Sequence, residues 1–138
     1  MGCREVRAVT KFKTLIDELQ DHGGSVQLRC EVARKLGTIG DPRALESLVA
    51  ALRDKNEEVR REAARALGVI KDPRALEPLA AALRDKDRGV RICAASALGA
   101  IKDPRAVVPL VVALSDKDEY VRASAAKALD SVESLRRI

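Results

Sequence analysis

The chain has 138 residues, enough for one domain, and 34% of them are charged although the net charge is only +5. Hydrophobic residues make up 46% of the chain but aromatic residues only 1%. This composition disfavours a β-sandwich and favours closely packed helices of Ala, Leu, Val and Ile. No apolar run reaches the roughly 18 residues of a membrane span, and the small basic excess does not by itself indicate nucleic-acid binding.

The first expected element is a helix over residues 4–20. Its apolar side chains follow the spacing i, i+3, i+4, i+7 of one helical face, at Phe12, Leu15, Ile16 and Leu19. A polar, Gly-rich loop at 21–25 then separates this helix from a second one, which opens at Leu28 and ends near 37–40. The pair is predicted to be a degenerate first repeat.

Three segments of 31 residues follow without a gap, and 15 of the 31 positions are identical in all three. Self-similarity at such a period indicates a solenoid, in which each unit buries its apolar face against its neighbours. We therefore predict an all-α fold, a right-handed α-solenoid of four helical hairpins with about eight helices. The expected single domain, 1–138, contains repeats 10–40 (degenerate), 41–71, 72–102 and 103–133, and a tail at 134–138.

Each full repeat begins with Asp-Pro, which predicts a capped helix start, because the carboxylate accepts backbone N–H groups and proline fits the first helical position. An interior proline bends a helix. We therefore expect a kinked first helix where Pro78 and Pro109 occur and a straighter one where Ser47 replaces them. Leu79 is among the predicted core residues. The expected caps of the second helices are Asn56, Asp87 and Asp118.

The repeat pattern D-P-R-A-L-x-x-L-x-x-A-L-x-D-x-x-x-x-V-R-x-x-A-A-x-A-L-G-x-I, over residues 41–133, resembles the HEAT-like repeats of the phycobilin-lyase type. Members of that family mostly bind proteins, and some handle bilin chromophores. The resemblance also implies a ladder of ion pairs between neighbouring repeats, from a turn aspartate to an arginine of the second helix. The matching residues are Asp54, Asp85 and Asp116 with Arg29, Arg60, Arg91 and Arg122.

The resemblance further implies that the second helices line a concave surface. Helical spacing then selects the positions that point away from the core, and these are where the repeats differ most. We expect a protein partner there, in contact with Glu31, Arg34, Thr38, Arg61, Glu62, Arg65, Val69, Ile92, Cys93, Ser96 and Lys127. Charges in the first two repeats and small or apolar side chains in the last two fit a partner with an acidic rim. Unselected drift on solvated helix faces would give the same variation.

We predict a non-enzymatic protein–protein interaction scaffold in the cytoplasm, without catalytic residues, cofactor or metal. The single histidine, His22, has no Cys or His at metal-ligand spacing. Nucleotide-binding and nucleophile motifs are missing, as are the paired His-Glu motifs with which some hydroxylases of this repeat type bind iron. The odd number of cysteines, three, indicates reduced thiols.

Two alternative functions remain open. One is a phycobilin lyase subunit or chromophore chaperone. The other is a nucleic-acid-binding protein that uses basic second helices, which the scarcity of aromatic residues for base stacking disfavours. No membrane association is expected. Two copies could also pair through the C-terminal end, where Val132, Leu135 and Ile138 are apolar.

Overall fold

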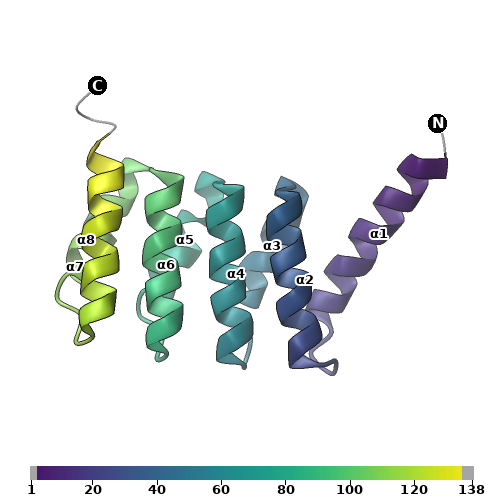
Figure 1. Ribbon diagram of the computed structural model, residues 1–138, viewed down its shortest axis with the longest axis horizontal. Coiled ribbons are helices and arrows are strands. Elements are labelled where there is room, and N and C mark those ends of the chain that lie inside the picture. The colour runs from purple at the N-terminus through teal and green to yellow at the C-terminus, as the bar shows by residue number, and fades with distance from the viewer. Residues whose placement is uncertain (1–2, 135–138) are drawn as a thin grey trace.

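The computed structural model describes the backbone of residues 3–134 and the side chains of residues 11–134. Within this part of the chain there are eight α-helices, three 3-10 helices and no strands (Figure 1). The α-helices are α1 (Cys3–Gln20), α2 (Val26–Ile39), α3 (Leu45–Ala51), α4 (Glu57–Ile70), α5 (Leu76–Ala82), α6 (Arg88–Ile101), α7 (Val107–Ala113) and α8 (Glu119–Glu133). The 3-10 helices are η1 (Pro42–Ala44), η2 (Pro73–Ala75) and η3 (Pro104–Ala106).

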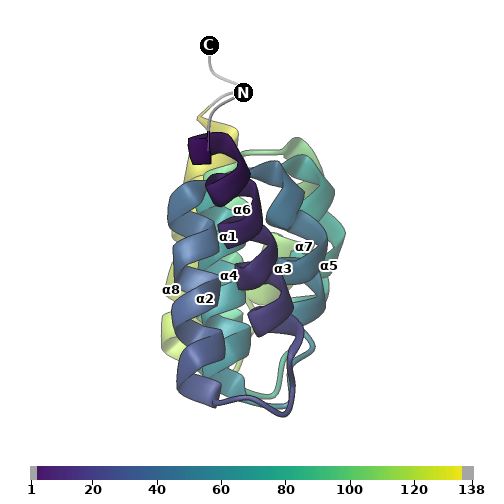
Figure 2. The same ribbon diagram turned by 90° about the vertical axis from the view of Figure 1, so that its right-hand side faces the viewer.

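The helices form two layers, as the predicted α-solenoid requires. Helices α2, α4, α6 and α8, called the second helices here, stand side by side along the row (Figure 1). Helices α3, α5 and α7 form the other layer, and each packs on the second helix that follows it (Figure 2). Helix α1 packs on α2 and α3. Each hairpin therefore completes its core against the neighbouring hairpins.

Asp-Pro begins each full repeat as expected, but with a tighter turn than a plain α-helix. Asp72 accepts the backbone N–H of Arg74 at 2.9 Å, and Asp41 and Asp103 make the same bond in their repeats. The proline then opens a 3-10 helix, and the α-helix follows it. The guanidinium group of the same arginine also donates hydrogen bonds to the aspartate carboxylate. These side-chain bonds hold the pKa of each of the three aspartates below its usual range.

Pro78 and Pro109 do not lie in the interior of a helix, which was the premise of the expected kink. Helices α3, α5 and α7 all have seven residues and begin at the same register, although the third residue is Ser47 in α3, Pro78 in α5 and Pro109 in α7. The reason is the 3-10 start, which places this residue within the first turn of the α-helix. The first four N–H groups of an α-helix have no partner inside it, so proline removes no internal bond there.

The second helices approach one another at glycine. A Cβ at Gly68 would lie 3.0 Å from Ala97 Cα, and a Cβ at Gly99 would lie 2.9 Å from Ala128 Cα. Leucines fill the space between the layers, and Leu79 and Leu98 are fully buried. Asn56, Asp87 and Asp118 cap the second helices by accepting backbone N–H groups, as predicted. The small residues therefore set the spacing of the row.

We expect Gly99→Ala to lower the free energy of unfolding by up to about 2 kcal/mol. Alanine gains up to about 1 kcal/mol of helix propensity, but overpacking against the α8 backbone costs about 1–3 kcal/mol. Urea denaturation followed by circular dichroism measures the balance. The control is Asp130→Ala, because Asp130 holds the equivalent position in α8 and is exposed. Stabilisation by Gly99→Ala equal to that by Asp130→Ala would show that the contact is not tight.

The predicted ion-pair ladder runs through the turns between hairpin helices. Arg29, Arg60 and Arg91 each direct Nε at an aspartate of the next repeat, with N–O distances of 3.0, 2.9 and 3.0 Å to Asp54, Asp85 and Asp116. Each arginine also donates to a backbone carbonyl, such as Asp54 O from Arg60 at 2.8 Å. Burial raises the pKa of Asp54, but hydrogen bonds from the Asn56 N–H and from Arg29 outweigh burial and lower it.

The ladder ends at Arg122, which is exposed and donates to Asp116 O at 2.7 Å. Near the other end of α8, Asp130 stands where the other second helices have glycine. A side chain at this position would prevent a further second helix from packing as closely as its predecessors. Val132 is buried in the core, so it does not supply the exposed apolar contact expected for a dimer. Leu135 and Ile138 lie outside the described residues.

Candidate functional site

The second helices form the inner side of the solenoid. They contact one another along the whole row, with glycine at the closest points. On the other side, grooves separate α3 from α5 and α5 from α7. When successive hairpins pack more closely through one helix layer than through the other, the row curves toward the more closely packed layer. The exposed surface of α2, α4, α6 and α8, called the second-helix face here, is therefore the concave one.

A group of charged side chains crosses this face from α2 to α6. Glu62 lies between Arg34 and Arg65, at 3.4 and 3.5 Å, so two guanidinium groups share one carboxylate. Both arginine side chains are more than 60% exposed, whereas that of Glu62 is only 15% exposed. The Cys93 side chain and Glu62 raise the pKa of Arg65. The cluster carries a net positive charge and turns its guanidinium groups toward solvent.

Arg61 reaches across to the next repeat at the edge of the same cluster. Its Nε lies 3.4 Å from Asp87 Oδ2. A Cβ at Gly89 would lie 2.6 Å from Arg61 Cδ, so the glycine leaves room for the arginine side chain. Glu58 and Tyr120 occupy the corresponding positions of the neighbouring repeats. Glycine occurs at this position only in the third repeat, and this difference between repeats is the sequence signal that could have indicated the contact.

The remaining predicted residues form rows across the second helices, one residue from each helix at the same register. One row is Arg34, Arg65, Ser96 and Lys127, all exposed. Thr38 and Val69 belong to a second row nearer the C-terminal ends, where Val69 is 59% exposed. Glu31 is exposed and Ile92 is half-buried. The structure therefore places on one face every residue predicted there except Cys93.

Cys93 is buried, contrary to its predicted exposure, and Cys30 is buried in the same way. Cys30 lies near Glu58 and Glu62 of α4, and Cys93 lies near Arg65 of α4, so each small side chain is covered by a neighbouring second helix. Burial, with Glu58 and Glu62 nearby, raises the pKa of the Cys30 thiol. A raised pKa keeps a thiol protonated and weakly nucleophilic. These two thiols therefore contribute to packing.

His22 lies in the loop before α2, away from the second-helix face. Its Nδ1 is 3.5 Å from Asp54 Oδ2, and its side chain is 63% exposed. Among the described residues, no group of three or more His, Cys, Asp or Glu side chains is arranged to hold a metal ion. None of the described helices combines the length and the apolar character that crossing a membrane requires.

The fold and this face define a helical-repeat protein with an exposed inner surface. The sequence profile of HEAT repeats matches residues 12–92 and 63–130, which together span most of the chain. The chain belongs to the HEAT repeat family. A search of curated protein sequences gave no match.

Three solved structures are similar to the chain. Human deoxyhypusine hydroxylase is 28% identical with a TM-score of 0.82, over 93% of this chain and 45% of that one. The complex of CpcE and CpcF of phycocyanin lyase from a Nostoc species is 26% identical with a TM-score of 0.79, over 91% and 54%. An engineered protein is 29% identical with a TM-score of 0.71, over 90% and 63%. The chain thus spans about half of the first two structures.

The expectation that the chain is not an enzyme is wrong. It rested on missing catalytic motifs, but two of the similar structures are a hydroxylase and a lyase, with more than 90% of this chain aligned to each. Repeats of this kind are built largely from framework residues, so a short catalytic motif is not required for a protein of this fold to belong to an enzyme. The resemblance to the phycobilin-lyase type of HEAT repeat is confirmed.

Proposed function

We propose that the chain binds a protein partner on the second-helix face, as one repeat domain in the cytoplasm. The observation that carries this proposal is the row Arg34, Arg65, Ser96 and Lys127, in which three of four exposed side chains are basic. Within the described residues, Glu62 is the one carboxylate paired with Arg34 and Arg65, and Lys127 has no ion pair. Neighbouring helices are about 8–10 Å apart, so a partner segment that crosses them meets successive cations.

Several features support a protein as the partner. Exposed Val69 and half-buried Ile92 add apolar contact beside the cations, and such mixed surfaces are typical of transient protein interfaces. The similar Nostoc structure is itself a complex of two proteins. Two buried free cysteines, Cys30 and Cys93, are in line with a reducing compartment. Acidic side chains on the partner would complete the charge pairing.

The test compares capture of partners by the wild-type chain and by Arg65→Glu with Lys127→Glu. Both residues are exposed, so the double variant should keep its melting temperature. We expect proteins captured by the wild type from a lysate of its native source to be lost with the variant, because two attractive charges become repulsive. The matched control is Arg53→Glu with Lys55→Glu, two exposed cations outside the second helices. Equal capture by both double variants would exclude this face.

A second candidate is a subunit of a lyase that attaches a bilin to a protein. The similarity to the phycocyanin lyase complex favours it, at 26% identity over 91% of this chain. Co-expression with a bilin and the apoprotein of phycocyanin tests it. A lyase subunit would give covalent visible absorbance on the apoprotein, in the presence of CpcE or CpcF as the second subunit. The absence of absorbance with either subunit would eliminate this candidate while leaving partner binding intact.

A further inference from the structure

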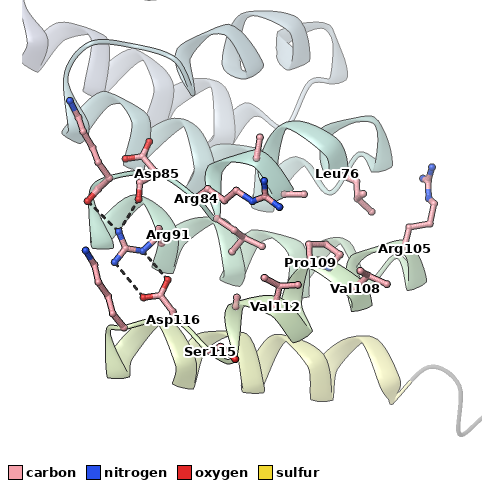
Figure 3. Close-up of a pocket in the computed structure, with 16 residues that line it drawn as sticks. Leu76, Arg84, Asp85, Arg91, Arg105, Val108, Pro109, Val112, Ser115 and Asp116 are labelled. Carbon is pink, nitrogen blue, oxygen red and sulfur yellow. Dashed lines mark hydrogen bonds and ion pairs between the residues drawn. The ribbon is translucent and has the colours of Figure 1, made fainter.

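The outer side of the solenoid carries a second surface, unrelated to the second-helix face. A groove of about 1030 Å³ lies between α5 and α7 (Figure 3). The groove between α3 and α5 is smaller, about 370 Å³. The floor of the larger groove is apolar and is formed by Leu76, Ala80, Ala81, Val108, Pro109 and Val112. The two grooves come from equivalent positions, so the difference between them lies in the side chains.

The fourth repeat replaces polar framework residues of this surface by apolar ones. Val108 stands where the second and third repeats have Glu46 and Glu77, and it is 73% exposed. Val112 stands where they have alanine, and it is 61% exposed. Apolar side chains gathered on the surface mark sites of interaction when they form a contiguous patch beside polar residues. Here they occur beside the larger groove.

A further repeat at the C-terminal end would not cover these valines. Glu46 and Glu77 remain exposed in the second and third repeats, although each of these repeats is followed by another. The register of Val108 and Val112 therefore points to the outer side and not toward the next hairpin. Figure 3 places Val108, Val112 and Pro109 along α7, on the groove that faces Leu76 of α5.

Unpaired basic side chains lie at one end of the apolar floor. Lys86 and Lys117 lie in the turns after α5 and α7, and Arg84 lies beside the former turn. Arg105, in η3 at the other end, is held by Asp103 at 2.8 Å. Within the described residues Arg84, Lys86 and Lys117 form no ion pairs. The two carboxylates that line the groove, Asp85 and Asp116, are already held by Arg60 and Arg91 in the ladder. The groove thus has uncompensated positive charge.

We propose that this groove binds an acidic amphipathic segment of a protein partner. Apolar side chains of the segment contact Val108 and Val112, and its carboxylates pair with Arg84, Lys86 and Lys117. Three cations distributed over two turns suit a peptide with several carboxylates better than an amphiphile with a single anionic head. A second copy bound symmetrically would oppose its own basic rim to this one, which costs free energy.

The probe is a short fluorescein-labelled peptide with leucines at helical spacing flanked by glutamates, and its counterpart has lysine for each glutamate. Fluorescence anisotropy should show the glutamate peptide bound at least about tenfold more tightly than the lysine peptide. Val108→Glu should weaken binding by about tenfold or more. This variant restores the residue of the second and third repeats, so it should fold normally. Lys13→Glu makes the same kind of charge change at an exposed position of α1, outside both proposed surfaces, and should leave the affinity unchanged.

Three results would overturn the proposal. The first is equal affinity for the two peptides or for the wild type and Val108→Glu. The second is a wild-type dimer in analytical ultracentrifugation that Val108→Glu converts to a monomer without peptide binding, which assigns the patch to a second copy. The third is binding to anionic phospholipid vesicles but not to the peptide, which assigns it to a lipid surface. The capture experiment with Arg65→Glu and Lys127→Glu tests the second-helix face, so its outcome does not depend on any of these three results.

Discussion

Arg60→Ala should lower the free energy of unfolding by about 3–5 kcal/mol, because it breaks a largely buried ion pair. The side chains of Arg60 and Asp85 are only 7% and 13% exposed, and their closest atoms are 2.9 Å apart. Without the guanidinium, the Asp85 carboxylate is left largely buried without its arginine and the Asp54 carbonyl loses a donor at 2.8 Å. Urea denaturation measured by circular dichroism gives the change.

The open end of the ladder provides the control for this prediction. Arg122 holds the equivalent position in α8, but it is exposed and its hydrogen bond goes to Asp116 O. Arg122→Ala should therefore cost no more than about 1 kcal/mol. Equal losses for the two variants would mean that the carbonyl bond, common to both, carries the effect and that the pair with Asp85 adds nothing.

Leu79→Ala should cost about 2–5 kcal/mol, since it removes a fully buried side chain and leaves a cavity between the layers. Leu79 belongs to α5, in a hairpin with neighbours on both sides, so the surroundings have little freedom to collapse. Val108→Ala removes an aliphatic side chain that is 73% exposed, and it should change stability by less than about 0.5 kcal/mol. An unchanged melting temperature for Leu79→Ala would refute the core assignment.

Most of the fold could be predicted because the same capping, packing and charged residues recur every 31 positions. Asp72 was expected to cap a helix since Asp-Pro recurs, and the structure confirms the bond to Arg74. The ladder was implied by the family resemblance, and Arg60 and Asp85 confirm it. Gly68 and Gly99 recur at the same position of the repeat, and each lies where the next second helix comes close. Each of these contacts depends on local geometry, which a repeat fixes.

Side chains that act between repeats were harder to predict. Helical spacing gives the direction of Cys93 but not the distance to the neighbouring helix α4, where Arg65 contacts it. Pro78 was expected in a helix interior, but the 3-10 start places it in the first turn of α5. Arg61 over Gly89, and Val108 in place of glutamate, are departures of one repeat from the others. Such departures become interpretable only when the structure shows what lies opposite them.

The ladder has a consequence for how the molecule opens. Each of its ion pairs joins residues 25 positions apart in the sequence. Contacts between residues of short sequence separation favour rapid folding. A linear array of this kind unravels from its ends, and amide hydrogen exchange should be fastest in the terminal hairpins and slowest around α4 and α6. A ligand that binds Arg34 and Lys127 at the same time would span the row from α2 to α8. The hairpins between them would then unfold together in one cooperative transition.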